Sequence, residues 1–237
     1  MVTVLIGVYS SSTEPMSIQD PQDFRTRLSR LDSCVVADAL DRLKLPGAVL
    51  GLHRVSTELK LVGPVLTVKL ERVDGQLANR HLCTAAIEAA KPGDIIVVEH
   101  HTRNDCAGWG GLLSYAARVR HVAGVIVDGM CRDIDDSRRM DFPVFARGVV
   151  PTTARGRVIE TAFNSSITVG SVHVNPNDWV IADSSGVVFL AHNDAALILE
   201  EAEKLAASET QLIDEIDKGK PVSQVMSATY EHMLRKE

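Results

Sequence analysis

The chain has 237 residues, of which 45% are hydrophobic, enough for a sizeable core in one α/β unit. Its formal net charge of −6 argues against nucleic acid as a partner held by bulk electrostatics. No apolar run approaches the length that spans a membrane. The four cysteines lack the spacing of a zinc or redox motif, so we expect reduced thiols in a cytoplasmic protein.

The N-terminal part of the sequence predicts a loose arm followed by two helices. Residues 1–20 become rich in Ser, Thr and Pro after a short apolar start, which is typical of a loose arm. A short helix is expected over residues 21–31. A second helix is expected over residues 34–43, because Asp32 can cap it.

Strands and one helix are predicted next. Residues 49–70 have strand character, with Gly63-Pro64 as an expected break. A helix is expected over residues 77–90, and residues 95–98 form an apolar run typical of a buried strand.

A glycine turn, a helix and a buried strand follow in the central part of the chain. Gly108, Gly110 and Gly111 let the backbone approach a ligand closely, and apolar residues at helical spacing come after them. The unpaired amides at the start of such a helix favour an anion. Residues 122–127 then form a β-rich apolar run, which we expect Asp128-Gly129 to end.

Arg132 and Asp133 lie just beyond the predicted end of this strand. Ligands of α/β folds bind at the carboxyl ends of strands, so the helix N-terminus, the guanidinium and the carboxylate are expected to converge. A helix N-terminus and a guanidinium bind carboxylates, whereas a carboxylate binds a hard cation. The stretch therefore predicts a site for an anionic ligand beside a cation.

The C-terminal half predicts a charged helical turn over residues 134–140, further strands and terminal helices. Strands are expected over residues 143–146, 158–174, 179–182 and 187–190. A long helix capped by Asn193-Asp194 should reach about residue 217, and an amphipathic helix should follow over residues 222–235.

Several of these motifs resemble those of the RraA-like family. The match is carried by Trp109-Gly-Gly-Leu-Leu113, Gly124-Val-Ile-Val-Asp-Gly129, Arg132-Asp133 and Phe142-Pro-Val-Phe-Ala-Arg147. The family includes 4-hydroxy-4-methyl-2-oxoglutarate / 4-carboxy-4-hydroxy-2-oxoadipate aldolases, oxaloacetate decarboxylases and a ribonuclease-E regulator. The resemblance implies an α/β fold, a swivelling-type β/β/α sandwich with mixed sheets and a helical C-terminus. It would form a single domain over residues 21–237.

The resemblance also implies a divalent-metal-dependent lyase, a class II aldolase or decarboxylase, that cleaves a small 2-oxo acid and leaves a pyruvate enolate. By analogy with the family, Arg132 is the catalytic, substrate-binding guanidinium and Asp133 is the ligand of Mg²⁺ or Mn²⁺. The turn that binds pyruvate in the family corresponds to Gly110, Gly111, Leu112 and Leu113.

The sequence departs from the family at one position. The family's aldolases carry an Asp, then twenty residues, then Arg-Asp, and counting back from Arg132 places Gly111 at that Asp. Glycine cannot act as an acid or base. We therefore expect either that decarboxylation is favoured over aldol cleavage or that another group, with Asp105 as a candidate, replaces the acid. The same loss leaves open a second function, a non-catalytic regulator that binds a protein such as a ribonuclease.

Other residues have simpler interpretations. His100 and His101 are adjacent and should point apart, so one packed and one solvent-facing ring is expected rather than a metal site. Cys106 and Cys131 flank the central stretch, and buried structural thiols are commoner than nucleophiles. The resemblance implies a homotrimer or homohexamer with active sites between subunits, and Glu209 is a candidate to reach a neighbour's site.

Overall fold

The structure, a computed structural model, describes residues 18, 20–73 and 80–226. The expected N-terminal arm therefore lies outside the described residues apart from Ile18 and Asp20, and so does the last part of the expected final helix.

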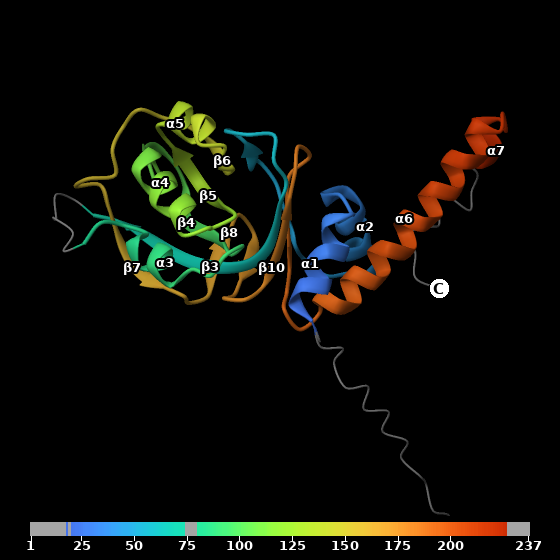
Figure 1. The fold of residues 1–237 in the computed structure, drawn as a ribbon, viewed down its shortest axis with the longest axis horizontal. Coiled ribbons are helices and arrows are strands. Elements are labelled where there is room, and N and C mark those ends of the chain that lie inside the picture. The colour runs from blue at the N-terminus through green and yellow to red at the C-terminus, as the bar shows by residue number, and fades with distance from the viewer. Residues whose placement is uncertain (1–17, 19, 74–79, 227–237) are drawn as a thin grey trace, which may run out of the picture.

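Helices lie at both ends of the chain and between the strands (Figure 1). The described helices are α1 (Pro21–Ser29), α2 (Ser33–Leu43), α3 (Thr84–Ala89), α4 (Gly111–Val119), α5 (Ile134–Arg139), α6 (Ala195–Asp217) and α7 (Val222–Val225). The described strands are β1 (Ala48–Val49), β2 (His53–Arg54), β3 (Leu61–Arg72), β4 (Ile95–Ala107), β5 (Gly124–Cys131), β6 (Val144–Val149), β7 (Val158–Phe163), β8 (Ile167–Val169), β9 (Val172–Val174), β10 (Trp179–Ala182) and β11 (Val187–Leu190).

The sheet is mixed and curled around a parallel centre. Strands β3, β4, β5 and β6 are parallel neighbours, and the order across the sheet is β1-β11-β10-β3-β4-β5-β6-β2, with β7 also paired to β3. Strands β8 and β9 form a separate antiparallel hairpin. The carboxyl ends of the parallel strands share one edge, and α4 and α5 begin just after β4 and β5 at that edge.

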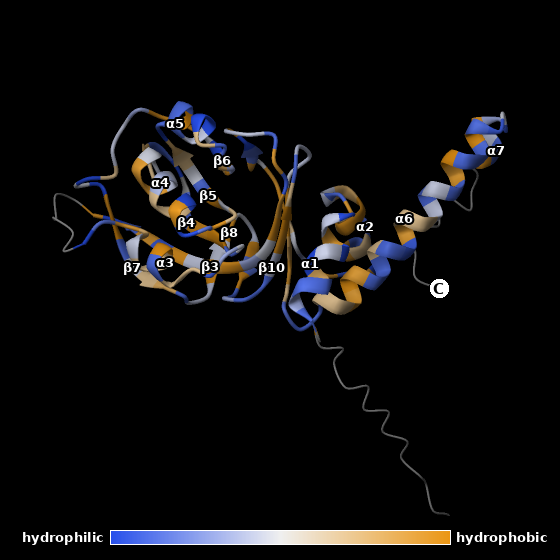
Figure 2. Ribbon diagram, viewed as in Figure 1, coloured by the Kyte–Doolittle hydropathy of each residue, from blue (hydrophilic) through white to orange (hydrophobic). Residues whose placement is uncertain are grey.

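Three apolar clusters hold the layers together. One joins α1, α2 and α6 to β10 and β11, a second fills the inside of the curled sheet under β8 and β9, and a third lies between the parallel strands and α3 and α4. Figure 2 shows β3 and β10 largely orange between the two groups of helices. This arrangement confirms the predicted β/β/α class with mixed strands and a helical C-terminus.

The two N-terminal helices follow their local signals closely. The side chain of Asp32 accepts a hydrogen bond from the amide of Val35 at the start of α2, a cap that typically contributes about 1 kcal/mol. The helix ends at Lys44, which has a left-handed backbone. The predicted bounds of α2 are therefore correct to within one residue.

Several predicted boundaries were wrong. Strand β4, predicted to end at residue 98, continues to Ala107. Strand β3 runs through Gly63-Pro64 without a break, because its first residues pair with β10 and the following ones pair with β4, and Pro64 lies at that change of partner. Strand β5 continues past Asp128-Gly129 to Cys131, since the Asp128 carboxylate is held inside the fold. Helix α3 begins only at Thr84.

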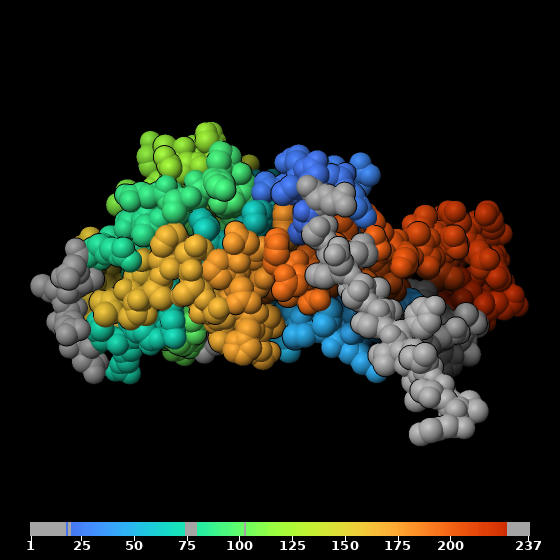
Figure 3. All heavy atoms as spheres, turned by 90° about the horizontal axis from the view of Figure 1, so that it is seen from below, coloured from blue at the N-terminus to red at the C-terminus, as the bar shows by residue number. Residues whose placement is uncertain are grey.

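Helix α6 extends well beyond the sheet. Figure 3 shows its orange-to-red end projecting past the rest of the described chain. Its first half is buried against α2, whereas Ile213 and Ile216 near its end are exposed. None of the described helices is long and apolar enough to cross a membrane.

Candidate active site

The glycine turn before α4 is hydrogen-bonded to the end of β5. The amide of Gly108 donates to the carbonyl of Met130 at 2.8 Å, and the amide of Arg132 donates to the carbonyl of Trp109 at 3.0 Å. These two bonds bring the first residues of α4 beside Arg132 and Asp133. The convergence that the sequence predicted is therefore present.

The side chain of Asp133 contacts both the start of α4 and Arg132. Its Oδ2 accepts a hydrogen bond from the amide of Gly111 at 3.1 Å and lies 3.4 Å from Nε of Arg132. Its backbone is left-handed, with φ of 57°, which Asp tolerates better than most residues because its carboxylate bonds locally. A Cβ atom at Gly110 would lie 2.9 Å from Asp133 Oδ2, so a larger residue there would displace the carboxylate.

The start of α4 offers unpaired amides to a ligand. The first bond of the helical ladder runs from the amide of Ser114 to the carbonyl of Gly110, so the amides of Leu112 and Leu113 precede it. The side chain of Leu112 is 78% exposed, while that of Leu113 is buried. Both residues line the cavity described below, so this predicted turn places a helix N-terminus, which favours anions, beside that cavity.

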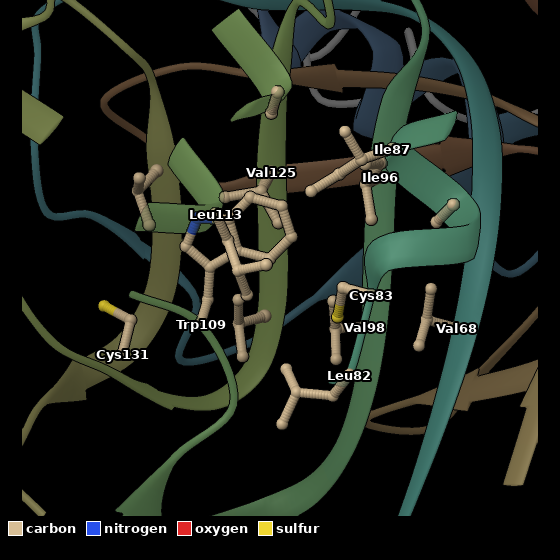
Figure 4. Close-up of a cluster of buried hydrophobic side chains, with 14 of the residues drawn as sticks. Val68, Leu82, Cys83, Ile87, Ile96, Val98, Trp109, Leu113, Val125 and Cys131 are labelled. Atoms are coloured by element: carbon tan, nitrogen blue, oxygen red, sulfur yellow. The ribbon is translucent and has the colours of Figure 1, made fainter. Parts of the chain in front are cut away.

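A buried polar chain fixes α4 relative to α5. Trp109 Nε1 donates to Ser114 Oγ at 2.9 Å, and Ser114 Oγ lies 2.9 Å from Ser137 Oγ on α5. The indole stacks on Phe142 with a ring separation of 6.4 Å. Figure 4 shows Trp109 beside Leu113 in the buried apolar cluster. This network holds the turn and the Arg132–Asp133 segment at a set spacing.

A cavity of about 330 Å³ opens beside Arg132 and Asp133. Its charged and imidazole lining residues are Arg80, His81, Arg132, Asp133, Arg155 and Glu160. Its larger apolar lining residues are Leu82, Trp109, Leu112, Leu113, Val158 and Ile159. The cavity thus has an apolar wall and more positive than negative side chains.

One wall of this cavity was not predicted. The carboxylate of Glu160 forms an ion pair with Arg80 and accepts a hydrogen bond from the amide of Cys83 at 2.6 Å. The Glu160 side chain is almost fully buried, so it holds Arg80 at the cavity edge. Arg155, from the loop before β7, lines the same cavity.

A second, more open groove is also lined by Arg132 and Asp133. This groove, about 470 Å³, includes Asp136 of α5. A Cβ atom at Gly111 would lie 2.7 Å from Asp136 Oδ2 and 3.0 Å from the Cβ of Asp133. The Asp136 carboxylate, which pairs with Arg139, therefore occupies the space that a side chain at position 111 would take.

The structure does not bring Asp105 or Glu209 to the cavity lining. Asp105 is exposed and bound to Arg103, whose hydrogen bonds lower the pKa of Asp105 to about 2. Glu209 lies on α6, where burial, with Asp32 and Asp38 nearby, raises the pKa of its carboxyl group. Neither residue faces the site within this chain.

The remaining predictions for histidine and cysteine side chains hold. His100 is fully buried and His101 is exposed, as expected for adjacent residues that point apart. Cys106 and Cys131 are buried, and burial raises the pKa of both thiols, that of Cys131 to about 12. Such thiols stay protonated and are poor nucleophiles.

Known proteins are similar to this chain in sequence and in fold. A model of the RraA-like family, described as Aldolase/RraA, matches residues 33–189. Protein DlpA of Legionella pneumophila is 24% identical over 198 residues, which cover 84% of this chain but only 32% of DlpA, so the chain spans about a third of that relative. A Halalkalibacterium halodurans protein named "Putative 4-hydroxy-4-methyl-2-oxoglutarate aldolase" is 30% identical over 190 residues, 79% of this chain and 85% of that protein.

Among solved structures, that of an uncharacterized protein from Pseudomonas syringae pv. tomato is similar, with a TM-score of 0.78 and 26% identity. The match covers 87% of this chain and 98% of that one. Because the family model covers more than half of the sequence, including the glycine turn, Arg132 and Asp133, the chain belongs to the RraA-like family.

Proposed function

We propose that the protein is a divalent-metal-dependent carbon–carbon lyase that acts on a small 2-oxo acid through a pyruvate enolate. The observation that carries this proposal is the meeting of three groups beside one cavity: the guanidinium of Arg132, the carboxylate of Asp133 and the N-terminus of α4. The name of the Halalkalibacterium relative supports the same class of reaction.

The side chains near Asp133 fit Mg²⁺ or Mn²⁺ better than a metal that needs several protein ligands. Among residues 18, 20–73 and 80–226, no three His, Cys, Asp or Glu side chains are arranged to hold an ion. Mg²⁺ commonly takes one or two carboxylates and completes its shell with water and substrate oxygens. The partly exposed carboxylate of Asp133 meets that requirement. When bound there, the ion would supply Lewis acidity to the 2-oxo group.

The other groups bind and orient the 2-oxo acid. The amides of Leu112 and Leu113 are assigned to the C1 carboxylate, as a helix N-terminus favours. The planar guanidinium of Arg132 is assigned to the oxygens on which negative charge develops as the bond breaks. Loss of one such donor typically lowers the rate by about 10²–10³-fold. Gly110 leaves the room that these contacts need.

Proton transfer is assigned to Asp136. Retro-aldol cleavage must remove a proton from the C4 hydroxyl before the C3–C4 bond breaks, whereas decarboxylation removes none, because the leaving carboxylate already carries its charge. Both reactions then add one proton to the enolate. The carboxylate of Asp136 takes the space next to Gly111 and lies in the neighbouring groove, outside the cavity lining. We therefore assign it a proton transfer through water, in place of the family acid. Replacement of Asp136 by Asn should therefore lower cleavage of a 4-hydroxy-2-oxo acid more than decarboxylation of oxaloacetate.

The arginine side chains that line the cavity favour a substrate with a second carboxylate. Arg80 and Arg155 line it together with Arg132, and guanidinium groups suit planar carboxylates. The 4-hydroxy-4-methyl-2-oxoglutarate in the relative's name is such a diacid. A panel of 4-hydroxy-2-oxo acids with and without a distal carboxylate, together with oxaloacetate, tests this assignment through pyruvate release with and without Mg²⁺. Release from no member of the panel would exclude the lyase.

The second candidate is a non-catalytic regulator that binds a protein partner. Gly111 favours it, because the residue that the family's aldolases use as an acid is missing. Partner binding and pyruvate release, measured for the wild type and Arg132→Ala, distinguish the two candidate functions. A regulator would still bind its partner after Arg132→Ala. It would release no pyruvate from any member of the panel.

We also propose that the protein forms a homotrimer or homohexamer. Exposed apolar side chains of α4 lie next to the site, with Leu112 at 78%, Tyr115 at 57% and Val119 at 59% exposure. Patches of this kind mark contact surfaces in many proteins. Light scattering of the wild-type protein and of Tyr115→Glu tests the interface, which predicts a smaller particle for the variant.

A further inference from the structure

The regular pairing of β4 with β5 is interrupted just before the glycine turn. The residues of β4 pair with β5 in register up to Val98, and the next pairs, at Arg103 and Ala107, follow after several unpaired residues of β4. His101 has a left-handed backbone, with φ of 50°. This irregularity directs the ring of His100 inward, where it is fully buried. Bulges next to active sites often re-aim a side chain in this way.

The ring of His100 fills the space between the glycine turn and the end of β5. A Cβ atom at Gly129 would lie 2.5 Å from His100 Cδ2, and one at Gly108 would lie 3.1 Å from the same ring. Nε2 of His100 lies 2.9 Å from the carbonyl oxygen of Cys106, so Nε2 carries the proton and donates it to that oxygen. The ring thus touches or binds both segments that carry the substrate groups.

The same ring has a feature that does not serve stability. Its Nδ1 is buried and has no hydrogen-bond partner among the described residues. A buried acceptor without a partner weakens folding, so an apolar side chain of similar size would serve the core better. Burial also lowers the pKa of His100, which keeps the ring neutral at neutral pH.

We propose that His100 is a positioning residue for the substrate turn. The ring acts as a spacer between Gly108 and Gly129, and its N–H group holds the carbonyl of Cys106 immediately before the turn. Together these contacts set the distance between the amides at the start of α4 and the Arg132–Asp133 pair. The catalytic part of this inference rests on the proposed lyase function, whereas the conformational part does not.

Three variants of the full chain test the inference. His100→Leu keeps an apolar core but loses the donor, and His100→Gln can place an amide N–H near the carbonyl of Cys106. Val68→Ala is the matched control, because it removes core volume from the cluster in Figure 4 without contact to the turn. Hydrogen exchange of amides 108–113, thermal unfolding and the separate kcat and KM values for pyruvate release are measured for each.

Positioning predicts that His100→Leu speeds exchange of amides 108–113 by at least tenfold. Its fall in Tm should be smaller than that of Val68→Ala, because removal of the unpaired Nδ1 offsets the loss of the bond to the Cys106 carbonyl. Positioning also predicts that kcat/KM falls by about 10²-fold, as about 1 Å of misplacement can cause. His100→Gln should recover most of both losses, and Val68→Ala should lower Tm alone. Unchanged exchange in His100→Leu, or parallel loss of Tm and exchange protection in both His100→Leu and Val68→Ala, would overturn the inference. If no variant or wild-type protein releases pyruvate, the lyase is wrong and the exchange data still decide the role of His100.

Discussion

Replacing Gly111 by Asp restores the acid that the family's aldolases carry, and the structure predicts that this change alone fails. The backbone of Gly111 is not left-handed, so an aspartate is allowed there by conformation. Space is the obstacle, because a Cβ atom at this position would lie 2.7 Å from Asp136 Oδ2. The sequence alone would predict that Gly111→Asp raises aldol cleavage, whereas the structure predicts that the Asp136 carboxylate opposes the new side chain.

The size of the effect follows from two contributions. An ordinary contact needs about 3.4 Å, so the Asp136 carboxylate must retreat by about 0.7 Å. Because this side chain is partly exposed, the cost is at the low end of the about 1–3 kcal/mol that overpacking takes. A second carboxylate at about 4 Å from the first adds about 1 kcal/mol when water screens the pair. Gly111→Asp should thus destabilise the fold by about 2 kcal/mol, a fall in Tm on the order of 5 °C.

The double variant Gly111→Asp/Asp136→Ala removes the Asp136 carboxylate, and with it the shortest contact and the charge repulsion, while the Cβ atoms of residues 133 and 136 remain at 3.0 Å. It should recover most of the lost Tm and cleave a 4-hydroxy-2-oxo acid at least as well as wild type, while Asp136→Ala alone should lose cleavage. Differential scanning calorimetry and pyruvate release measure the two effects in parallel. A single Gly111→Asp variant with wild-type Tm and raised cleavage would refute this steric and electrostatic reasoning.

Three further predictions address the site and its support. Arg132→Lys should lower kcat/KM for pyruvate release nearly as much as Arg132→Ala, by about 10²–10³-fold. Lysine keeps the charge but lacks the planar, two-pronged donor group of arginine. A lysine variant that retained most of the activity would show that only the charge at this position matters. Gly110→Ala should lower kcat/KM at nearly unchanged Tm, because the new Cβ would lie 2.9 Å from Asp133 Oδ2 and would displace that carboxylate. Full activity of this variant would show that the substrate binds elsewhere. Burial works to raise the pKa of Asp183, but hydrogen bonds from Ser33 and from the amide of Ser185 outweigh it and lower that pKa below 3.8. The stability that Asp183 contributes is therefore complete above about pH 4 and is lost as pH falls through the lowered pKa. Urea midpoints measured from pH 2 to 7 should consequently fall less steeply at acid pH in Asp183→Asn than in the wild type. An equally steep fall in the variant would contradict this.

Local signals in the sequence were enough to predict the N-terminal helices and the approach of the glycine turn to Arg132 and Asp133. Asp32 caps α2 as predicted, because the cap needs only residues three positions apart. The approach of the glycine turn to Arg132 and Asp133 follows from the rule that strands and helices meet at one edge of a parallel sheet. These predictions use short stretches whose geometry is set within the stretch.

Features that depend on distant residues were missed. Asp128 reads as the end of a strand, but it lies inside β5 because its carboxylate binds Nε of Arg147 at 2.5 Å and the amide of Gly170 at 2.9 Å. The cavity wall joins Arg80 to Glu160, eighty positions apart. The crowding of Gly111 by Asp136 depends on how α5 packs on α4, which no spacing in the sequence reports.

The central claim is that Asp133 holds the divalent ion on which cleavage depends. The most direct test is pyruvate release after chelator treatment and re-addition of Mg²⁺ or Mn²⁺, in the wild-type protein and in Asp133→Ala. The proposed mechanism predicts that chelator abolishes release, that either ion restores it in the wild type, and that neither restores it in Asp133→Ala at ordinary concentrations. Full release in excess chelator, or full restoration in Asp133→Ala, would contradict it.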